Sequence, residues 1–265
     1  MRYVPAVSCA RPEQCDAHQI NVAIKADTVF DENYPYLDRS FKTRFMRGLV
    51  KALLFFLGFF LMYITAGIRI KGRKNLRKNR KILKNGFVTV SNHIHVWDFV
   101  GIMLAFMRYK PNVPVWDKNM LGKDRRFVKW VGGIPIPEKL SALKCFSRAV
   151  DELLKNKKWV HFYPEGSLWH YYSEIRPFKK GAFTFAVKSN VPVIPLAYTY
   201  RKPRGLFRLL RKTATLTLNI GEPLFPAQDA APWLAALNLC ERARSEVMRL
   251  AEITEDVWAD KALTA

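Results

Sequence analysis

The sequence predicts an α/β fold in which strands and helices alternate along a single domain. The chain has 265 residues, and a domain usually takes about 100–200, so we expect one domain or one domain with an attached segment. Apolar residues make up 49% of the chain, which is enough for a sizeable core and excludes a disordered polycation. Short β-branched runs alternate with runs of helical spacing, and this alternation indicates helices layered on a sheet.

Five short apolar runs predict the strands, because they are rich in β-branched and aromatic residues. They cover residues 87–91, 133–136, 159–163, 193–200 and 213–220. The run 159–163 has the composition of a buried strand. Residues 213–220 alternate between apolar and polar side chains, which predicts a strand at the edge of the sheet.

Four runs with helical spacing predict the helices between and after these strands. They cover residues 97–107, 141–155 and 181–189, and a last helix that Pro232 opens. In the last helix the spacing predicts that a set of five apolar side chains faces the core: Leu234, Leu237, Cys240, Val247 and Leu250.

The charge of the chain predicts a polyanionic partner. Lys and Arg number 44 against 22 Asp and Glu, a formal net charge of +22, which suits either nucleic acid or the anionic face of a membrane. The four cysteines are scattered and none lies in a C-x-x-C pair, so they give no zinc signature and fit a reduced, cytosol-facing compartment.

The densest charge brackets an apolar run, which favours a membrane over nucleic acid. Residues 39–84 hold 14 Lys and Arg and no Asp or Glu, and they enclose the apolar run 52–68. Its 17 residues are short for a spanning helix, which takes about 20. Three structures remain open: a single span, a shallow helical hairpin bent near Gly58 that dips into one leaflet, and a buried core helix. Residues 1–38 are slightly acidic and either fold over the domain or form a mobile tail.

The first motif that carries chemistry follows the strand 87–91. It begins at Asn92 and includes His93 and Asp98, which are five residues apart. If His93 lies in the loop and Asp98 in the first turn of the next helix, the carboxylate accepts from one ring nitrogen. The other nitrogen is then free to take a proton from a hydroxyl group. The alternative is that both residues only cap the helix and satisfy loop amides.

The second motif ends the strand 159–163 and reads Tyr163-Pro164-Glu165-Gly166-Ser167. The glycine permits a sharp turn, and a carboxylate at the carboxyl end of a strand faces the usual ligand crevice of an α/β sheet. The alternative is an ordinary turn with an exposed glutamate. Ser167 lies in no G-x-S-x-G elbow, and the other histidines have no metal-ligand spacing, so we expect no metal site.

In this order, N-H-x-x-x-x-D followed by [FY]-P-E-G, the two motifs resemble those of the PlsC-like glycerolipid acyltransferases. The segments 132–136, 178–182 and 191–196 resemble further blocks of that family. The resemblance covers roughly residues 70–225. It implies a single acyltransferase domain with a central mixed β-sheet flanked by helices, and an N-terminal membrane-binding helical motif. The boundaries we expect are 1–38 for the extension, 39–84 for membrane attachment, 85–225 for catalysis and 226–265 for a C-terminal helix.

The resemblance also implies the reaction. His93 acts as the base and Asp98 holds it, while the acceptor hydroxyl attacks the thioester of acyl-CoA or acyl carrier protein directly, so no cofactor is required. We expect the enzyme on the cytoplasmic face of an anionic membrane, monotopic or single-pass, with a lysolipid acceptor. The oligomeric state is not indicated. The residues expected at the substrate are Asn92, Lys139, Glu165, Gly166, Ser167, Arg176, Lys179 and Lys180.

Two departures from the family pattern concern the acceptor. The family usually continues P-E-G-T-R and ends its second block in D-R or N-R, whereas Leu168 and Glu138 stand at the two arginine positions here. Nearby lysines or Arg176 can replace these arginines for lysophosphatidate. Alternatively, the acceptor carries no phosphomonoester and is a glycolipid or an aminolipid.

Two other classes of function stay open from the sequence alone: a basic nucleic-acid-binding protein and a catalytically inactive membrane adaptor. The basic and apolar stretch 201–212 has three interpretations, as a second membrane contact, as a site for the phosphates of CoA, or as a solvated loop.

Overall fold

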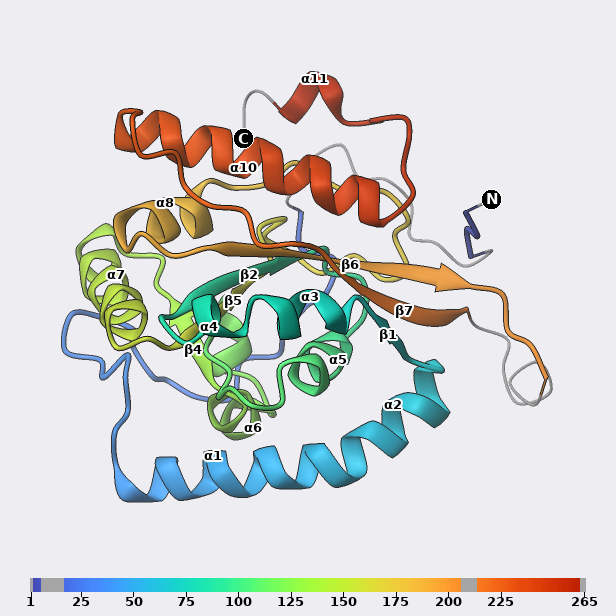
Figure 1. Cartoon of the computed structure of the whole chain (residues 1–265). Coiled ribbons are helices and arrows are strands. Elements are labelled where there is room, and N and C mark those ends of the chain that lie inside the picture. The colour runs from blue at the N-terminus through green and yellow to red at the C-terminus, as the bar shows by residue number, and fades with distance from the viewer. Residues whose placement is uncertain (1, 6–16, 206–213, 263–265) are drawn as a thin grey trace.

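The computed structural model describes residues 2–5, 17–205 and 214–262, and Figure 1 shows their arrangement. The main sheet has the strand order β1-β7-β6-β2-β5. Its strands are β1 (Arg69–Lys71), β2 (Phe87–Ser91), β5 (Trp159–Phe162), β6 (Val193–Arg201) and β7 (Thr215–Ile220). A separate parallel pair consists of β3 (Val113–Trp116) and β4 (Gly133–Ile136).

The sheet is mixed, as expected, because β2 pairs in parallel with β5 and β6 while β6 and β7 are antiparallel. The prediction that residues 213–220 form an edge strand is wrong. The strand β7 lies between β6 and β1, with Thr217 paired to Arg69, so both of its edges are hydrogen-bonded to other strands. The basic composition of β1 hid this outer strand.

Helices cover both faces of the sheet (Figure 1). On one face lie α7 (Leu140–Lys155), α8 (Gly181–Lys188) and α10 (Pro232–Leu250), packed on a core that includes Val88, Val160 and Val193. The other face carries Phe87, Trp159 and Leu218 and packs under α5 (Asp98–Ala105) and the N-terminal helix. The remaining short helices are α3 (Arg73–Lys78), α4 (Arg80–Leu83), η2 (Asp117–Met120), α6 (Arg125–Trp130) and α11 (Ala259–Ala262).

The prediction for the inward face of α10 is confirmed only in part, since Leu237 and Leu250 are half-buried. Cys240 and Val247 are buried, but Leu234 is 44% exposed, and Ala235 and Ala236 are buried in its place. The buried face runs through Ala235, Leu239, Ala243 and Val247, and with it α10 packs against α8 and β6. Most of the basic stretch 201–212 lies outside the described residues.

The apolar run 52–68 forms the second half of one bent helix, not a hairpin. The segments α1 (Phe41–Leu53), the π-helical turn η1 (Leu54–Gly58) and α2 (Phe59–Ala66) follow one another without a reversal (Figure 1). Gly58 keeps helical dihedral angles (φ −64°, ψ −37°), so the chain does not turn there. The residue that ends the helix is Gly67, in the left-handed conformation.

One side of this N-terminal helix packs on the domain and the other side is exposed. Gly58, Met62 and Ala66 are buried, whereas Phe41 is 84% and Phe56 is 74% exposed. Among the described residues, no helix is both long enough and apolar enough to cross a bilayer.

Of the two possibilities for the N-terminal extension, the structure shows the folded one for residues 17–38. Trp169 donates through its indole nitrogen to the carbonyl of Ala17 at 2.8 Å, and the His18 ring stacks on Trp116 at 3.9 Å. Further along, Tyr36 is part of the main core. This segment therefore connects the loop after β5 to the end of β3.

Candidate active site

His93 and Asp98 form a hydrogen-bonded pair at the carboxyl end of β2. The strand ends at Ser91, the loop carries His93, and Asp98 is the first residue of α5. The ring nitrogen Nδ1 of His93 lies 2.7 Å from Oδ2 of Asp98. This is the loop-and-first-turn geometry that the five-residue spacing requires.

Asp98 is held ionised despite complete burial. Burial alone raises the pKa of a carboxyl group, but the neighbouring His93 and hydrogen bonds from His93, Tyr163 and the backbone amide of Ile94 outweigh it and lower the pKa of Asp98. An ionised carboxylate only accepts, so Nδ1 of His93 carries the proton that it donates. In the neutral form of this tautomer Nε2 has a free lone pair, as a general base requires.

Tyr163 fixes both members of the pair. Its hydroxyl donates to Oδ1 of Asp98 at 2.6 Å, and its ring stacks on the His93 ring with centroids 3.8 Å apart. Burial and the charge of Asp98 raise the pKa of Tyr163 well above its ordinary value, so the phenol stays protonated and remains a donor. Sequence reasoning did not assign Tyr163 a role, although its place immediately before Pro-Glu-Gly was the available signal.

Glu165 joins the two motifs. Its Oε2 accepts a hydrogen bond from the backbone amide of His93 at 3.1 Å, and its Oε1 accepts from the amide of Arg176 at 3.0 Å. The guanidinium of Arg176 completes a buried ion pair with Glu165 at 2.9 Å and donates to the hydroxyl of Ser167 at 2.7 Å. It also lies over the Trp169 ring, 4.3 Å from its centroid.

Four of the residues expected at the substrate are therefore used within the protein. Glu165, Ser167 and Arg176 form the buried network just described. Asn92 exchanges hydrogen bonds with the backbone of Tyr198 at 3.1 and 2.8 Å, which fastens the end of β2 to β6. This geometry favours positioning roles for all four, and their contact with substrate stays a prediction.

The other expected substrate residues are on the surface. Gly166 adopts φ +84° at an exposed turn, and the side chain of Lys179 lies against it, 3.1 Å from where a Cβ would stand. Lys179 and Lys180 are exposed just before α8. Lys139 is exposed at the start of α7 and interacts with Glu32. Of these four surface residues, Gly166 and Lys179 lie against each other at the second motif.

The two departures from the family pattern are also located. Glu138 is exposed and pairs with Lys118 at 3.8 Å, and Leu168 is half-buried in the loop after β5. No arginine therefore stands at either position.

His161, one of the histidines for which the sequence predicts no metal site, is buried next to Tyr163 on the same sheet face. The His161 ring is edge-on to the Tyr163 ring at 4.5 Å, and its Nδ1 lies 2.8 Å from the Thr89 hydroxyl. Burial lowers the pKa of His161 to about 3, so this ring is neutral near pH 7.

The chain has relatives of known name. Residues 67–199 match the family model described as Acyltransferase. The chain is 26% identical over 165 residues to human 1-acyl-sn-glycerol-3-phosphate acyltransferase beta, covering 59% of this chain and 57% of that protein. It is 26% identical over 174 residues to the 1-acyl-sn-glycerol-3-phosphate acyltransferase of Bacillus subtilis (strain 168), covering 64% and 80%. The matches span about half the length of the first curated relatives.

The fold is also that of a solved structure. The crystal structure of the 1-acyl-sn-glycerophosphate (LPA) acyltransferase PlsC from Thermotoga maritima superposes with a TM-score of 0.54 at 21% identity, covering 83% of this chain and 87% of that one. At this identity the likeness concerns the fold alone. The family match covers half of the chain and includes the His93–Asp98 pair and the Glu165 turn, and on this basis the chain belongs to the acyltransferase family.

Proposed function

We propose that this protein transfers a fatty acyl group from a thioester to the hydroxyl of a lysolipid. The observation that carries the proposal is the His93–Asp98 pair, in which Nε2 of a partly exposed ring is left free to accept a proton. The donor is acyl-CoA or acyl carrier protein, and both are anionic, which suits a chain of net charge +22.

The proposed reaction is a single direct transfer. Nε2 of His93 takes the proton of the acceptor hydroxyl as its oxygen attacks the thioester carbonyl. The C–O bond forms, the C–S bond breaks, and the thiolate leaves and receives a proton from His93. Asp98 stabilises the imidazolium in between. An acyl-enzyme is not needed, because the acceptor and the donor are held together.

The acceptor that we favour is 1-acylglycerol-3-phosphate, which gives phosphatidate. The names of the relatives support it, and Lys179 supplies a cation beside the Gly166 turn. The second candidate is a lysolipid without a phosphomonoester, such as a glycolipid or an aminolipid. It is favoured by Glu138, an exposed carboxylate at one of the two positions where the family offers arginine.

Membrane attachment through the N-terminal helix is also part of the proposal. Phe41, Phe45, Leu49, Leu53 and Phe56 are exposed at intervals of three or four residues, so they form one apolar stripe, and α1 carries four lysines and arginines and no acidic residue. A helix of this kind lies in the interface of an anionic membrane, with the catalytic domain on the cytoplasmic face.

A thiol-release assay with palmitoyl-CoA on detergent-solubilised protein tests the reaction and the acceptor together. Wild type and His93→Ala are each given lysophosphatidate, a lysoglycolipid or an aminolipid. We expect lysophosphatidate to drive release that falls about 10²–10⁴-fold in His93→Ala. Release with another acceptor alone would select the second candidate, and release that does not depend on His93 would refute the proposed base.

A further inference from the structure

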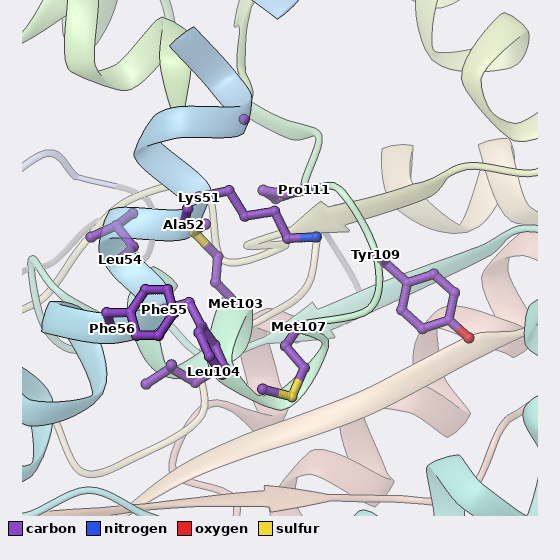
Figure 2. A pocket seen from close by; sticks show the side chains of 11 residues that line it. Lys51, Ala52, Leu54, Phe55, Phe56, Met103, Leu104, Met107, Tyr109 and Pro111 are labelled. Atoms are coloured by element: carbon purple, nitrogen blue, oxygen red, sulfur yellow. The ribbon is translucent and has the colours of Figure 1, made fainter. Parts of the chain in front are cut away.

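A cavity of about 260 Å³ separates the N-terminal helix from the far end of α5 (Figure 2). Gly48, Ala52 and Phe55 line it from the helix, and Met103 and Met107 line it from α5 and the turn that follows. The catalytic Asp98 is the first residue of α5, so the cavity and the His93–Asp98 pair lie at opposite ends of this helix. The cavity therefore belongs to a different part of the surface from the proposed reaction.

Lys51 is the charged residue in this apolar lining. Its side chain reaches from the helix toward the segment 107–111 (Figure 2). It is half-buried, and burial together with the nearby Lys110 lowers its pKa. Within the described residues Lys51 forms no ion pair, and α1 contains no acidic residue. An ammonium group that has lost water and lies near a second cation favours an anion supplied from outside the chain.

We infer that the cavity binds one acyl chain of an anionic membrane phospholipid, whose headgroup contacts Lys51 and Lys110. The cavity is smaller than the roughly 300–1,000 Å³ of typical small-molecule pockets, so it suits one acyl chain and not a whole lipid. The apolar lining suits the chain and the two lysines suit the headgroup.

The position of the cavity indicates that the acyl chain bound in it belongs to a lipid of the membrane. The exposed Leu49, Leu53 and Phe56 belong to the same helical segments as the lining residues, so the helix that would lie on the bilayer also walls the cavity. A lipid of that bilayer can insert one tail without leaving the membrane. The inference thus rests on the proposed membrane attachment, and it does not depend on acyl transfer.

Two pairs of variants separate the tail from the headgroup. Gly48 lines the cavity, and a Cβ added there meets nothing within 4 Å, so Gly48→Leu fills the cavity and Gly48→Ala is its matched control. Lys51→Met removes the charge but keeps an apolar stem. Lys42→Met removes an exposed cation elsewhere on α1 and controls for the general loss of charge.

Native mass spectrometry of the full chain, released from detergent micelles that contain equimolar phosphatidylglycerol and phosphatidylcholine, measures the bound lipid directly. We expect wild type to retain one phosphatidylglycerol per chain, with a preference of about 30-fold, the ratio that two lysines near a lipid surface provide. Lys51→Met leaves Lys110 in place and should lower the preference to about fivefold, the ratio that one lysine provides, and Gly48→Leu should retain neither lipid. Lys42→Met and Gly48→Ala should behave as wild type.

The inference is overturned if wild type shows no preference or if Gly48→Leu retains phosphatidylglycerol as wild type does. A third arm adds palmitate, and displacement of the phospholipid by palmitate would assign the cavity to a free fatty acid instead. Because retention is measured in micelles, it is scored separately from vesicle attachment and from thiol release. A failure of the proposed membrane attachment or of the proposed acyl transfer can then be distinguished from a failure of lipid binding in the cavity.

Discussion

Tyr163 and Asp98 are joined by a hydrogen bond of 2.6 Å that uses the carboxylate oxygen His93 leaves free. One oxygen of Asp98 accepts from the imidazole and the other from the phenol, so the carboxylate cannot rotate away from the ring. The same phenol ring stacks on His93. The second motif thus positions the residue of the first motif that we propose as the base.

Replacing Tyr163 with phenylalanine should slow the reaction without weakening substrate binding. The variant keeps the ring that stacks on His93 and loses the donor to Asp98. A hydrogen bond to a charged group is worth about 1.5–3 kcal/mol, so kcat should fall about 10–100-fold with KM unchanged. Tyr36→Phe is the control, because that hydroxyl binds backbone carbonyls of Phe30 and Asp31 in another part of the protein. A kcat equal to that of the control would show that the bond is unimportant.

The Glu165–Arg176 pair should be strongly coupled in stability. Removing one partner of a buried ion pair leaves an uncompensated charge and typically costs about 3–5 kcal/mol. We expect Glu165→Gln and Arg176→Met each to lower the free energy of unfolding by that order, and the double variant to lose less than the sum. Denaturant unfolding of all four proteins gives the coupling energy. Additive losses would mean that the two side chains act independently.

Gly166 should not tolerate a side chain. Its φ of +84° strains any L residue, and an added Cβ would lie 3.1 Å from Cε of Lys179. We expect Gly166→Ala to destabilise the protein by about 1–3 kcal/mol and to reduce activity, since the turn carries Glu165. Gly181→Ala is the control, because Gly181 starts α8 and its Cβ meets nothing within 4 Å. The two variants are compared by thermal unfolding and thiol release, and equal behaviour would contradict the strained turn.

Burial of the neutral His161 predicts a loss of stability in acid. Its pKa is about 3 in the folded protein and about 6.5 when unfolded, so below pH 6.5 the unfolded chain binds a proton that the folded chain does not. The stabilisation that the neutral His161 ring provides is fully present above pH 6.5 and is lost as the pH falls toward 3. Between pH 7 and pH 5 wild type should lose about 2 kcal/mol more than His161→Leu. Urea unfolding at the two pH values measures this difference. Equal losses of stability in wild type and His161→Leu would show that another group takes up the proton.

Exposed aromatic residues of the N-terminal helix should carry vesicle binding. Phe56→Asp removes an apolar contact and repels an anionic surface, so flotation with phosphatidylglycerol vesicles should fall at least tenfold. Trp233→Asp is the control. Trp233 is 69% exposed near the start of α10, across the molecule from α1 (Figure 1). Equal flotation of both variants would show that the N-terminal helix does not carry the membrane contact.

Much of this fold is readable in the sequence where the local pattern and the burial agree. The strands at 87–91 and 133–136 and the helix at 141–155 are found within about one residue of their predicted bounds, because apolar spacing and turn residues mark them together. The strand β1 was missed because two of its three residues are basic, and its place beside β7 depends on pairing with residues more than 140 positions away. That missing partner also explains the wrong edge assignment of β7.

The site was predictable in part for the same reason. The spacing of His93 and Asp98 is local, so a loop followed by a first helical turn was enough to bring them together. The contacts of Glu165 and Tyr163 with that pair join residues 65 to 72 positions apart in the chain. Arg176 was expected at the substrate because a sequence shows its charge but not its burial. Only the fold shows that its charge is already neutralised by Glu165.

The π-helical turn at Leu54–Gly58 sets the phase of the N-terminal helix. A π turn holds one residue more than an α turn, so it rotates everything after it by about 100° relative to an unbroken α-helix. That rotation brings Gly58 against Val100 and turns Met62 and Ala66 inward, while Phe56 faces outward. Deleting a single residue there would keep the charge and still rotate α2 by about 100°, which would turn Met62 and Ala66 away from the core. The exact number of residues in this helix is therefore as much a part of the design as their apolar character.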